Sequence, residues 1–439
     1  MKRWIAVLAC ALVVAGVALM IAGGVRYGGV TGLLLRVRAE IGAQRPHAAF
    51  VPTPLPTAPG QATALPTPPS SDTPTISATI AGAPAPDTRT PRIAPTARAA
   101  PTQTPGATWP PPHTPGPTPA APDALVELTG LSHVWQTWNN CGPATLSMYL
   151  SYWGTYFSQE EIRLVVRPNP EDKHAGPQEL ADVAQAQGLR ALVRINGSAQ
   201  RLRTLLANGL PVMVSTWHED DPGDGMGHYR LIVGYDDGAG EWLLYDSLAA
   251  TAADRDAPYE PLRLAYGVFA SLWKVFDYRY LLVYPDEMSD IVQAIVAEDM
   301  VDQTMWERAL EHALGELAED DQNPFHWFNL GTNLVALGRH QEAASAYDQA
   351  RQLGLPWRML WYQFGPFPAY YAVGRYDEVI ALADATLAVT QHVEELHYWR
   401  AMALAAKGEH AAARAALRRA LDLKPGYPEA TRAWQDLGE

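Results

Sequence analysis

The stretch Gln136-Thr137-Trp138-Asn139-Asn140-Cys141-Gly142-Pro143-Ala144-Thr145 is the part of the sequence around which the rest of the chain is organised. Cys141 is one of two cysteines, and the other, Cys10, lies in an apolar N-terminal run. Residues 143–152 are predicted to form a helix, which places the thiol at a helix start. The helix dipole and the free N–H groups there favour the thiolate, the reactive form of cysteine. Cys141 is therefore a candidate nucleophile, and its use requires a base and an orienting acid elsewhere.

Composition and charge exclude several classes of protein. A length of 439 residues leaves room for two or three domains, and 48 % hydrophobic residues is ordinary for a globular protein. The net charge of −14 argues against a nucleic-acid partner, because phosphate binding needs a basic surface. With two cysteines, one of them in the apolar run, a disulfide scaffold is excluded.

The N-terminus is predicted to be a membrane anchor. Lys2 and Arg3 precede an uncharged run of roughly 20 residues, enough to cross a bilayer as a helix. The run is longer than a usual signal-peptide core and lacks a clean cleavage site, so residues 1–25 are predicted to be a retained transmembrane helix rather than a cleaved signal. A lipid on Cys10 is a less favoured alternative. Residues 26–50 are expected to be a juxtamembrane segment, and the flanking positive charges do not decide the orientation.

Residues 51–122 are rich in Pro, Thr, Ala and Ser and have few large apolar side chains, so they cannot bury a core. They are predicted to be a disordered linker, which at roughly 3.1 Å per residue reaches up to about 200 Å. A second interpretation is an O-glycosylated stalk that holds the following domains away from a membrane. Such stalks are more frequent outside cells. This favours a single-pass protein of the cell membrane with its C-terminal domains extracytoplasmic.

Residues 123–287 have a globular composition and are predicted to form an α+β domain. Ser158-Gln159-Glu160-Glu161 is a capping-box pattern that predicts a helix start. Further helices are expected over 177–187, 199–206 and about 260–276. Strands are expected over 124–134, 189–195, 211–217, 228–235, 242–245 and 279–284. The early part of the domain is thus helical, and the late part is a mostly antiparallel sheet.

His228, Asp246 and Gln136 are the candidate partners of the thiol. His228 follows a glycine-rich loop and begins an apolar strand, a position that suits a general base. A hairpin that returns at 242–245 brings Asp246 back toward His228, where it would fix the imidazole tautomer. The register of the hairpin cannot be read from the sequence, and a bulge would serve to place both side chains on one face. Gln136 lies five residues before Cys141, and the two together are the expected oxyanion donors.

Each candidate also has a purely structural interpretation. A lone buried cysteine is usually a small apolar residue, and a histidine in a strand is more often structural. The acidic loop near the candidate base has the composition of a metal site, but no second histidine lies at ligand spacing. A solvated loop, and no metal or organic cofactor, is predicted for His218, Asp220, Asp221 and Asp224.

Taken together, Gln-x-x-x-x-Cys-Gly-Pro-Ala, Gly-His-Tyr before an apolar strand and Tyr-Asp-Ser after a hairpin resemble the C39-like peptidase family over roughly residues 125–285. These are papain-like cysteine peptidases related to the leader-cleaving domains of bacteriocin exporters. The family often has Asp-Pro where this chain has Asp246-Ser247. No segment resembling an exporter's membrane or nucleotide-binding domain follows, so a dedicated bacteriocin-leader peptidase is not expected. The resemblance implies a nucleophile, a base, an orienting acid and an oxyanion donor at Cys141, His228, Asp246 and Gln136.

Residues 288–439 are predicted to be helical, with a repeat of roughly 34 residues. Gly-Arg-His-Gln-Glu-Ala-Ala recurs in related form at 374–380 and at 408–414. The spacing resembles tetratricopeptide repeats, whose stacked helix pairs bind peptides or partner proteins on a concave face. Residues 306–317 read as part of a degenerate earlier copy. An insertion at 364–368 is expected to distort one helix.

The sequence therefore predicts a bacterial, membrane-anchored cysteine peptidase with a Cys-His-Asp triad, whose repeat module recruits a peptide substrate or a protein partner. Two alternatives remain. One is an inactive, peptidase-like extracytoplasmic scaffold that acts through its repeats. The other is acyl transfer or peptidoglycan amidase chemistry with the same thiol and imidazole.

Overall fold

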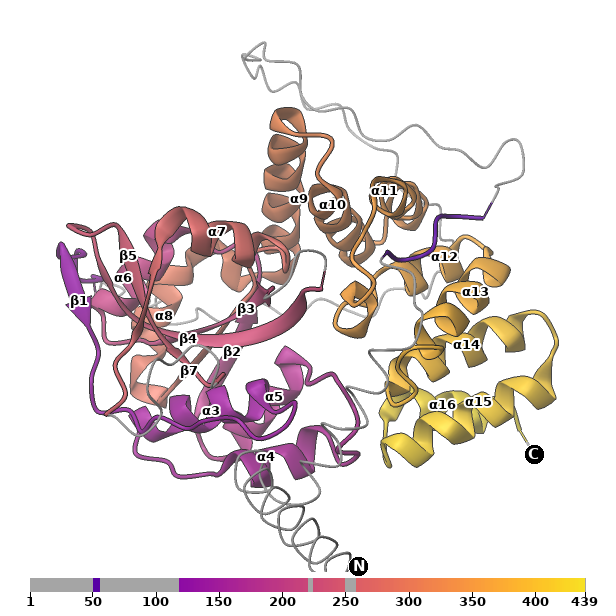
Figure 1. Ribbon diagram of the computed structural model, residues 1–439, viewed down its shortest axis with the longest axis horizontal. Helices are drawn as coiled ribbons and strands as arrows, with labels where there is room; N and C mark the ends of the chain where they lie inside the picture. The colour runs from indigo at the N-terminus through magenta and orange to yellow at the C-terminus, as the bar shows by residue number, and fades with distance from the viewer. Residues whose placement is uncertain (1–49, 56–117, 220–223, 249–257, 439) are drawn as a thin grey trace, which may run out of the picture.

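The computed structural model describes residues 50–55, 118–219, 224–248 and 258–438 of the chain. These residues form a domain of one sheet covered by helices, followed by a region of helical repeats (Figure 1). The predicted anchor, residues 1–25, and the juxtamembrane residues 26–49 lie outside the described residues. Among the residues that are described, no helix has the length and apolar character needed to cross a membrane.

The sheet of the described domain has seven strands, with the order β2-β7-β3-β4-β5-β6 and with β1 paired to the end of β4. All of its strand pairs are antiparallel, as predicted for most of the sheet. Both β2 and β3 pair with β7, so these two run parallel to each other with β7 between them. The strands are β1 (Leu125–Glu127), β2 (Arg190–Arg194), β3 (Val212–His218), β4 (Met226–Asp236), β5 (Glu241–Asp246), β6 (Leu262–Ala265) and β7 (Tyr280–Tyr284).

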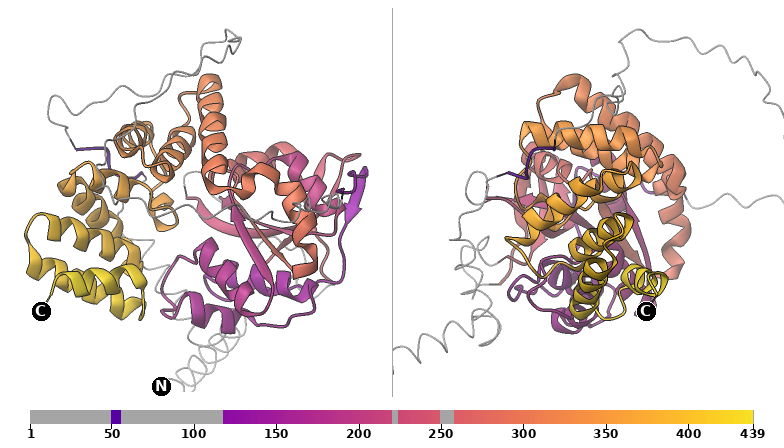
Figure 2. Two further views of the ribbon diagram at one scale, coloured as in Figure 1. Left: turned by 180° about the vertical axis from the view of Figure 1, so that it is seen from behind. Right: turned by 90° about the vertical axis from the view of Figure 1, so that its right-hand side faces the viewer.

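Helices cover both faces of this sheet (Figures 1 and 2). Alternate side chains of a strand point to opposite faces, and in β7 Leu281 and Val283 face one core while Leu282 faces the other. One face is covered by α3 (Cys141–Tyr152), α4 (Gln159–Val166) and α5 (Pro177–Ala186). The other is covered by α6 (Ala199–Ala207), α7 (Tyr266–Lys274) and α8 (Ser289–Val296). The predicted capping box at Ser158 is present, and α5 begins at Pro177 as expected.

Two predicted elements of this domain are wrong in extent. The first strand covers only 125–127 instead of 124–134, because the chain leaves β4 after three paired residues. The helix expected over 260–276 is strand β6 followed by α7. Leu262 and Leu264 alternate at period two and pack on the same core as β5, which favours a strand over a helix there.

The repeat region stacks helix pairs side by side, as the right-hand panel of Figure 2 shows. Glycines with a left-handed φ of +72° to +80°, at 338, 374 and 408, end the first helix of each pair. The region begins with α9 (Asp302–Glu319), because α8 packs on the sheet domain instead of on the repeats predicted from residue 288. The following helices are α10 (Pro324–Ala336), α11 (His340–Leu353), α12 (Pro366–Ala372), α13 (Tyr376–Leu387), α14 (Glu394–Ala406), α15 (His410–Leu423) and α16 (Pro428–Asp436).

The middle pair is distorted at the insertion. Its first helix, α12, has only seven residues and follows a short 3-10 turn, η4 (Met359–Trp361). The segment between α11 and α12 therefore leaves the helix stack and extends toward the sheet domain. Trp217, Val275 and Phe276 of the sheet domain belong to the same buried cluster as the repeat core, so the two regions share apolar packing.

Both ends of the Pro/Thr-rich linker lie on the folded body, unlike the free linker predicted over 51–122. Residues 50–55 are extended against the repeats, and Val51 is buried. At the other end, the Ala120 backbone N–H donates to Asn208 Oδ1 at 2.9 Å. Residues 56–117, which make up most of the predicted linker, lie outside the described residues. The disordered-linker and stalk interpretations of that segment stay predictions.

A one-residue bulge in β4 changes the register of the β4–β5 hairpin. Gly234 pairs with Leu243, whereas Ile232 pairs with Leu244, so Val233 is the additional residue. The face of the strand changes there, because Leu231 and Val233 pack in one core and Tyr235 packs in the other.

Gly234 is required at this bulge. A Cβ at Gly234 would lie 2.2 Å from the Val126 carbonyl oxygen of β1, a backbone atom that cannot move aside easily. We therefore expect Gly234→Ala to lower the free energy of unfolding by about 3 kcal/mol, the upper end of the usual cost of overpacking. Gly267→Ala is the matched control, since its Cβ would point into open space in α7. Equal denaturant midpoints for the two variants would contradict the requirement for glycine.

Candidate active site

Cys141 is the first residue of α3, as the sequence predicts to within two residues. Asn140 precedes the helix but makes no side-chain cap. Its carboxamide instead donates to Gln159 Oε1 at 2.9 Å and accepts from Arg167 at 3.2 Å. The side chain of the N-cap residue therefore does not take up the first-turn N–H groups, whose partial positive charge favours a thiolate at this position.

Gln159 holds the loop that leads to the thiol. Its Oε1 accepts from the Thr137 backbone N–H at 2.9 Å, and its Nε2 donates to the Trp135 carbonyl at 2.9 Å. Arg167 is buried beneath the same loop, with its guanidinium donating to Asn140 and to the Asp172 carbonyl. Sequence reasoning missed both roles. Gln159 was identified only as part of a helix cap, and no local pattern connects it to the cysteine loop.

Gly142 lets the start of α3 approach β4. A Cβ at this position would lie 3.2 Å from the Tyr229 ring and 3.3 Å from Leu180. Tyr229 is fixed in turn, because its hydroxyl donates to the Ala175 carbonyl at 2.9 Å. The close approach places the Cys141 side chain against the strand that carries His228.

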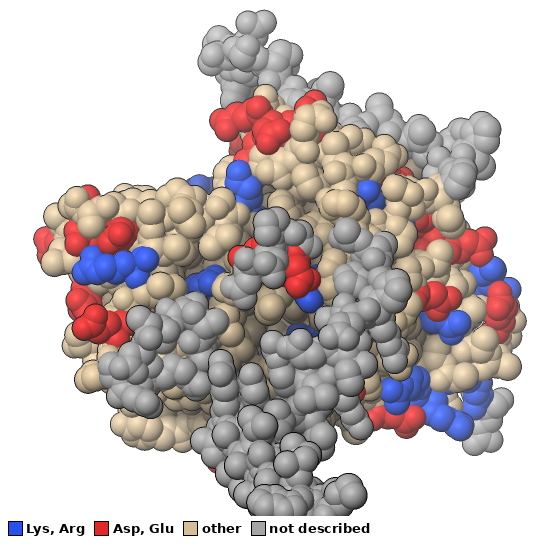
Figure 3. Space-filling view, viewed as in Figure 1, with Lys and Arg blue, Asp and Glu red and all other residues tan. Residues whose placement is uncertain are grey.

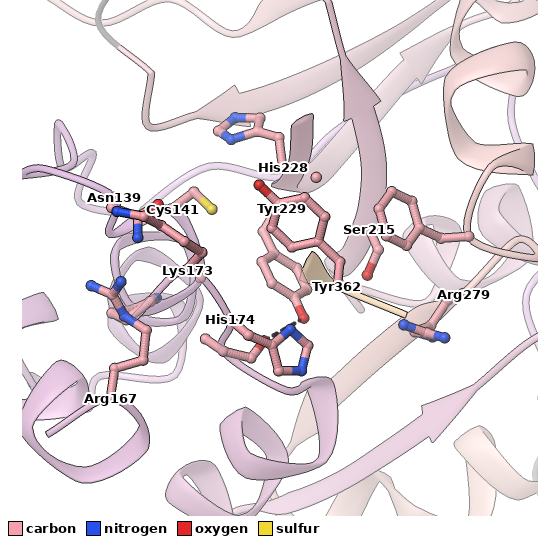
Figure 4. A pocket seen from close by; sticks show the side chains of 15 residues that line it. Asn139, Cys141, Arg167, Lys173, His174, Ser215, His228, Tyr229, Arg279 and Tyr362 are labelled. Carbon is pink, nitrogen blue, oxygen red and sulfur yellow. Dashed lines mark hydrogen bonds between the residues drawn. The ribbon is translucent and has the colours of Figure 1, made fainter. Parts of the chain in front are cut away.

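Cys141, His228 and Asp246 form one connected chain of contacts. Figure 4 shows the sulfur of Cys141 directed away from α3 toward the β4 side of the pocket. The thiol is hydrogen-bonded to the His228 imidazole. On the far side of the ring, His228 Nε2 lies 2.8 Å from Asp246 Oδ1. Since Nε2 is taken by the carboxylate, Nδ1 is the nitrogen that faces the thiol.

The β4 bulge makes the histidine–aspartate contact possible. Asp246 lies directly opposite Arg230 in the hairpin, and Arg230 is two residues from His228 on the same face of β4. Without the additional residue Val233, Asp246 would lie opposite Leu231, and its side chain would point to the other face. The hairpin thus brings the two predicted residues together only through a bulge, as the sequence interpretation allowed.

Asp246 is fully buried, and each of its polar groups has a partner. Its Oδ2 accepts from Arg230 Nε at 2.8 Å, and its Oδ1 also accepts from the Leu248 backbone N–H at 2.8 Å. Its own N–H donates to the Tyr259 hydroxyl, and its carbonyl lies 2.8 Å from His133 Nε2. The rings of His133 and Tyr259 stack at 3.5 Å between centroids.

These supporting residues were missed by sequence reasoning. The strand pattern gave a weak indication that Arg230 has a buried partner, because a charged residue at an inward position of an apolar strand needs one. Arg230 donates to Thr216 Oγ1 at 2.5 Å as well as to Asp246. His133 and Tyr259 gave no signal. His133 is 113 residues from Asp246 in the chain, and no local pattern links Tyr259, 13 residues after it, to the aspartate.

The pKa values of the pair favour a thiolate and an imidazolium. Burial raises the pKa of the Cys141 thiol, but His228, the Tyr229 backbone and Arg167 together outweigh it, so the net shift is downward. Burial lowers the pKa of His228, while the Asp246 carboxylate and the Cys141 hydrogen bond raise it to about 9. The pKa of Asp246 lies well below its ordinary value, because His228 and Arg230 outweigh its burial.

Gln136 lies beside Asp246-Ser247 and not in the wall of the pocket. Its Oε1 accepts from the Ser247 hydroxyl at 2.9 Å, and its backbone N–H donates to the Ser247 carbonyl at 2.8 Å. Ser247 therefore anchors the glutamine. Because Oε1 is bound to Ser247, the amide nitrogen is the end of the carboxamide that remains to donate elsewhere. Its role as an oxyanion donor stays a prediction.

The pocket at Cys141 is positively charged. It is lined by Arg167, Lys173 and Arg279, while none of its described lining residues is an Asp or Glu. Burial lowers the pKa of Lys173 to about 8, which leaves it mostly charged at neutral pH. The outer surface differs. On the face in Figure 3, Lys and Arg lie among Asp and Glu, and acidic side chains gather over the end of α9.

One wall of the pocket comes from the repeat region. Tyr362, which follows η4, lines the pocket (Figure 4). Its hydroxyl is hydrogen-bonded to the Gly227 backbone. Phe364 packs edge-on against His174, with ring centroids 5.2 Å apart. Arg358 of the same segment pairs with Asp224 at 2.5 Å. The insertion that distorts the middle repeat thus contributes to the pocket.

The shifted pKa of His228 predicts a pH dependence. A raised pKa stabilises the folded state fully below about pH 6.5, and the contribution is lost as pH rises through about 9. In Asp246→Asn the carboxylate that holds the proton is gone. We therefore expect His228 to lose its proton at least about one pH unit lower.

The ring-proton NMR shift of His228 measures this change, with the exposed Asp290→Asn as control. An identical titration in wild type and Asp246→Asn would contradict the assignment of Asp246 as the group that holds the imidazolium.

Comparison with known proteins supports the resemblance inferred from the sequence. Residues 129–281 match the model of the Peptidase_C39 like family, and residues 367–428 match the tetratricopeptide repeat model. The chain thus contains a C39-like peptidase region followed by tetratricopeptide repeats, and the predicted resemblance is confirmed. No curated protein matches the chain.

Solved structures of both kinds are similar to parts of the chain. Xylellain, a cysteine protease from Xylella fastidiosa, is 13 % identical with a TM-score of 0.30, covering 39 % of this chain and 91 % of that one. The peptidase domain of Streptococcus ComA is 16 % identical with a TM-score of 0.28, covering 36 % and 100 %. MamA from Desulfovibrio magneticus RS-1 is 16 % identical with a TM-score of 0.28, covering 30 % and 74 %. Scores this low carry no argument about activity.

Proposed function

We propose that this chain, with its C39-like peptidase region and tetratricopeptide repeats, is a papain-like cysteine peptidase that hydrolyses peptide bonds. The observation that supports it most is the connected contact from Cys141 through His228 to the buried Asp246. A nucleophile, a base and an orienting acid in hydrogen-bond contact, beside a pocket, are the parts that covalent hydrolysis needs.

In the first step the Cys141 thiolate attacks the carbonyl carbon of the peptide bond. The oxygen of the tetrahedral intermediate is held by the Cys141 backbone N–H together with the Gln136 amide nitrogen. When the C–N bond breaks, His228 gives its proton to the leaving amine. The product is a thioester between the acyl group and Cys141, with His228 now neutral.

In the second step neutral His228 takes a proton from water, and the oxygen attacks the thioester carbonyl. The C–S bond breaks, the acid is released, and the thiolate–imidazolium pair is restored. Asp246 keeps Nε2 protonated and the ring oriented in both steps, a role that its buried contact with Arg230 supports. The residues proposed here supply the nucleophile, the proton transfers and the oxyanion donors of both steps.

The repeat region is proposed to take part in substrate recognition as well as partner recruitment. Tyr362 supplies a wall of the pocket, so a peptide that reaches Cys141 also contacts the repeats. We further propose that residues 1–25 anchor the protein in the cell membrane as a single pass, with the folded domains extracytoplasmic. Protease accessibility on intact cells tests this topology, and a protected C-terminal part would exclude it.

The rate at which Cys141 reacts with iodoacetamide tests the pair directly. The His228→Ala variant is expected to react at least about 100-fold more slowly near neutral pH, because it lacks the base that maintains the thiolate. His410→Ala is the control, since His410 is exposed at the start of α15. Equal rates in wild type and His228→Ala would reject the peptidase and favour the inactive scaffold.

The charge of the pocket predicts the kind of substrate side chain that is preferred. In matched peptides that differ only in a Glu or Gln near the scissile bond, kcat/KM is expected to favour Glu by about tenfold, as for one charge-assisted hydrogen bond. Arg279→Gln should reduce this preference, because Arg279 lines the pocket. Arg190→Gln, at an exposed ion pair with Asp286, should leave it unchanged. No preference in wild type would contradict the prediction.

A further inference from the structure

The extended segment Phe50-Val51-Pro52-Thr53-Pro54-Leu55 is bound to the repeat region (Figure 1). It runs antiparallel to the residues after α11, with a bridge between Phe50 and Pro356. The Val51 backbone N–H donates to the Leu355 carbonyl at 2.9 Å. The Val51 side chain is 3 % exposed and lies in the apolar core of the repeats. The segment is therefore packed as a ligand would be.

A buried ion pair forms hydrogen bonds with the backbone of this segment. Arg351 of α11 and Glu378 of α13 pair at 2.6 Å, with side chains 2 % and 3 % exposed. Arg351 also donates from Nε to the Pro52 carbonyl at 2.7 Å and from Nη2 to the Thr53 carbonyl at 3.1 Å. Glu378 Oε2 accepts from the Leu55 backbone N–H at 2.9 Å. Both charged groups thus use part of their hydrogen-bonding capacity on the peptide.

These contacts form a site and not a chance surface contact. Buried charges need hydrogen-bond partners, and the segment supplies three backbone groups to the ion pair. The prolines fix φ at positions 52 and 54, so the segment loses little freedom when it binds in an extended form. Arg351 is held in place from behind, because it also donates to the Tyr370 hydroxyl at 3.0 Å.

The site lies on the second helices of the repeat pairs. Arg351 and Glu378 lie on α11 and α13, the second helices of two successive pairs. The pocket at Cys141 is lined from the repeat region by Tyr362, which is not part of this ion pair. The site is thus separate from the proposed peptidase chemistry.

We propose that the Arg351–Glu378 surface is a binding site for extended peptides of the form apolar-Pro-Thr-Pro, with residues 50–55 of the same chain as its resident ligand. The apolar side chain fills the Val51 position, and the ion pair binds the carbonyls that follow. A linker of the length of residues 56–117 gives the resident segment an effective concentration on the order of 1 mM. An external polypeptide of the same form binds by displacing it.

Other segments of the chain can be compared with residues 50–55. Pro-Thr-Pro recurs at 66–68 and at 117–119. Leu65 precedes the first copy and supplies a branched apolar side chain, as Val51 does. Gly116 precedes the second copy and supplies none. A peptide of residues 63–70 is therefore expected to bind, and a peptide of residues 115–120 is expected not to.

Fluorescence anisotropy of a labelled peptide of residues 48–56 tests the proposal on the full chain. Val51→Asp places a charge in the apolar position and releases the resident segment. This variant is expected to bind the peptide at least tenfold more tightly than wild type, in which the site is filled. Adding Arg351→Gln to Val51→Asp should abolish binding. Circular dichroism of that double variant shows whether the repeats remain folded.

Three outcomes would overturn the proposal. The first is equal binding by wild type and Val51→Asp. The second is equal binding of the 48–56 and 115–120 peptides to Val51→Asp, which requires no Arg351 variant and so stands even if that variant misfolds. The third is a wild-type dimer that Val51→Asp dissociates, which would assign the segment to a second copy of the chain. None of these measurements depends on the reactivity of Cys141. A negative result would therefore leave the peptidase proposal unaffected.

Discussion

The buried carboxylate of Asp246 is the group on which the candidate site depends. It lies between His228 and Arg230, two residues of β4 that share one face, and a buried carboxylate with two cationic partners has no favourable alternative position. The contact exists only because β4 carries one additional residue at Val233. Beside the bulge, Gly234 is required because β1 pairs with β4 there and leaves no room for a Cβ. The geometry of the candidate site therefore depends on backbone features well outside the pocket.

The sheet domain and the repeat region follow each other in the chain and also contact each other at the pocket. Tyr362 of the repeat region lies against Gly227, immediately before His228, and the two regions share one apolar cluster. The insertion in the middle repeat gives up part of a helix and forms this contact instead. If the chain is the peptidase we propose, its repeats are part of the substrate site as well as a recruiting module.

The two described ends of the Pro/Thr-rich linker are bound to the folded domains. Composition indicated a long spacer, and composition still explains why such a segment builds no core of its own. Its first residues nevertheless bind the repeats through main-chain groups, and its last residues are held by Asn208. The described ends of the linker, residues 51–55 and Ala120, are therefore part of the folded body.

Local patterns in the sequence determined much of the fold. The start of α3 at the thiol, the capping box at Ser158 and the period of the repeats are all read from neighbouring residues, because helix signals act within one or two turns. The candidate triad was also found, since a hairpin returns Asp246 toward His228. Tertiary structure alone decided the bulge, the hold of Gln159 on the cysteine loop, the Tyr362 wall and the binding of residues 50–55. These contacts join residues that are far apart in the chain, or depend on a shift of one residue, and a single sequence records neither.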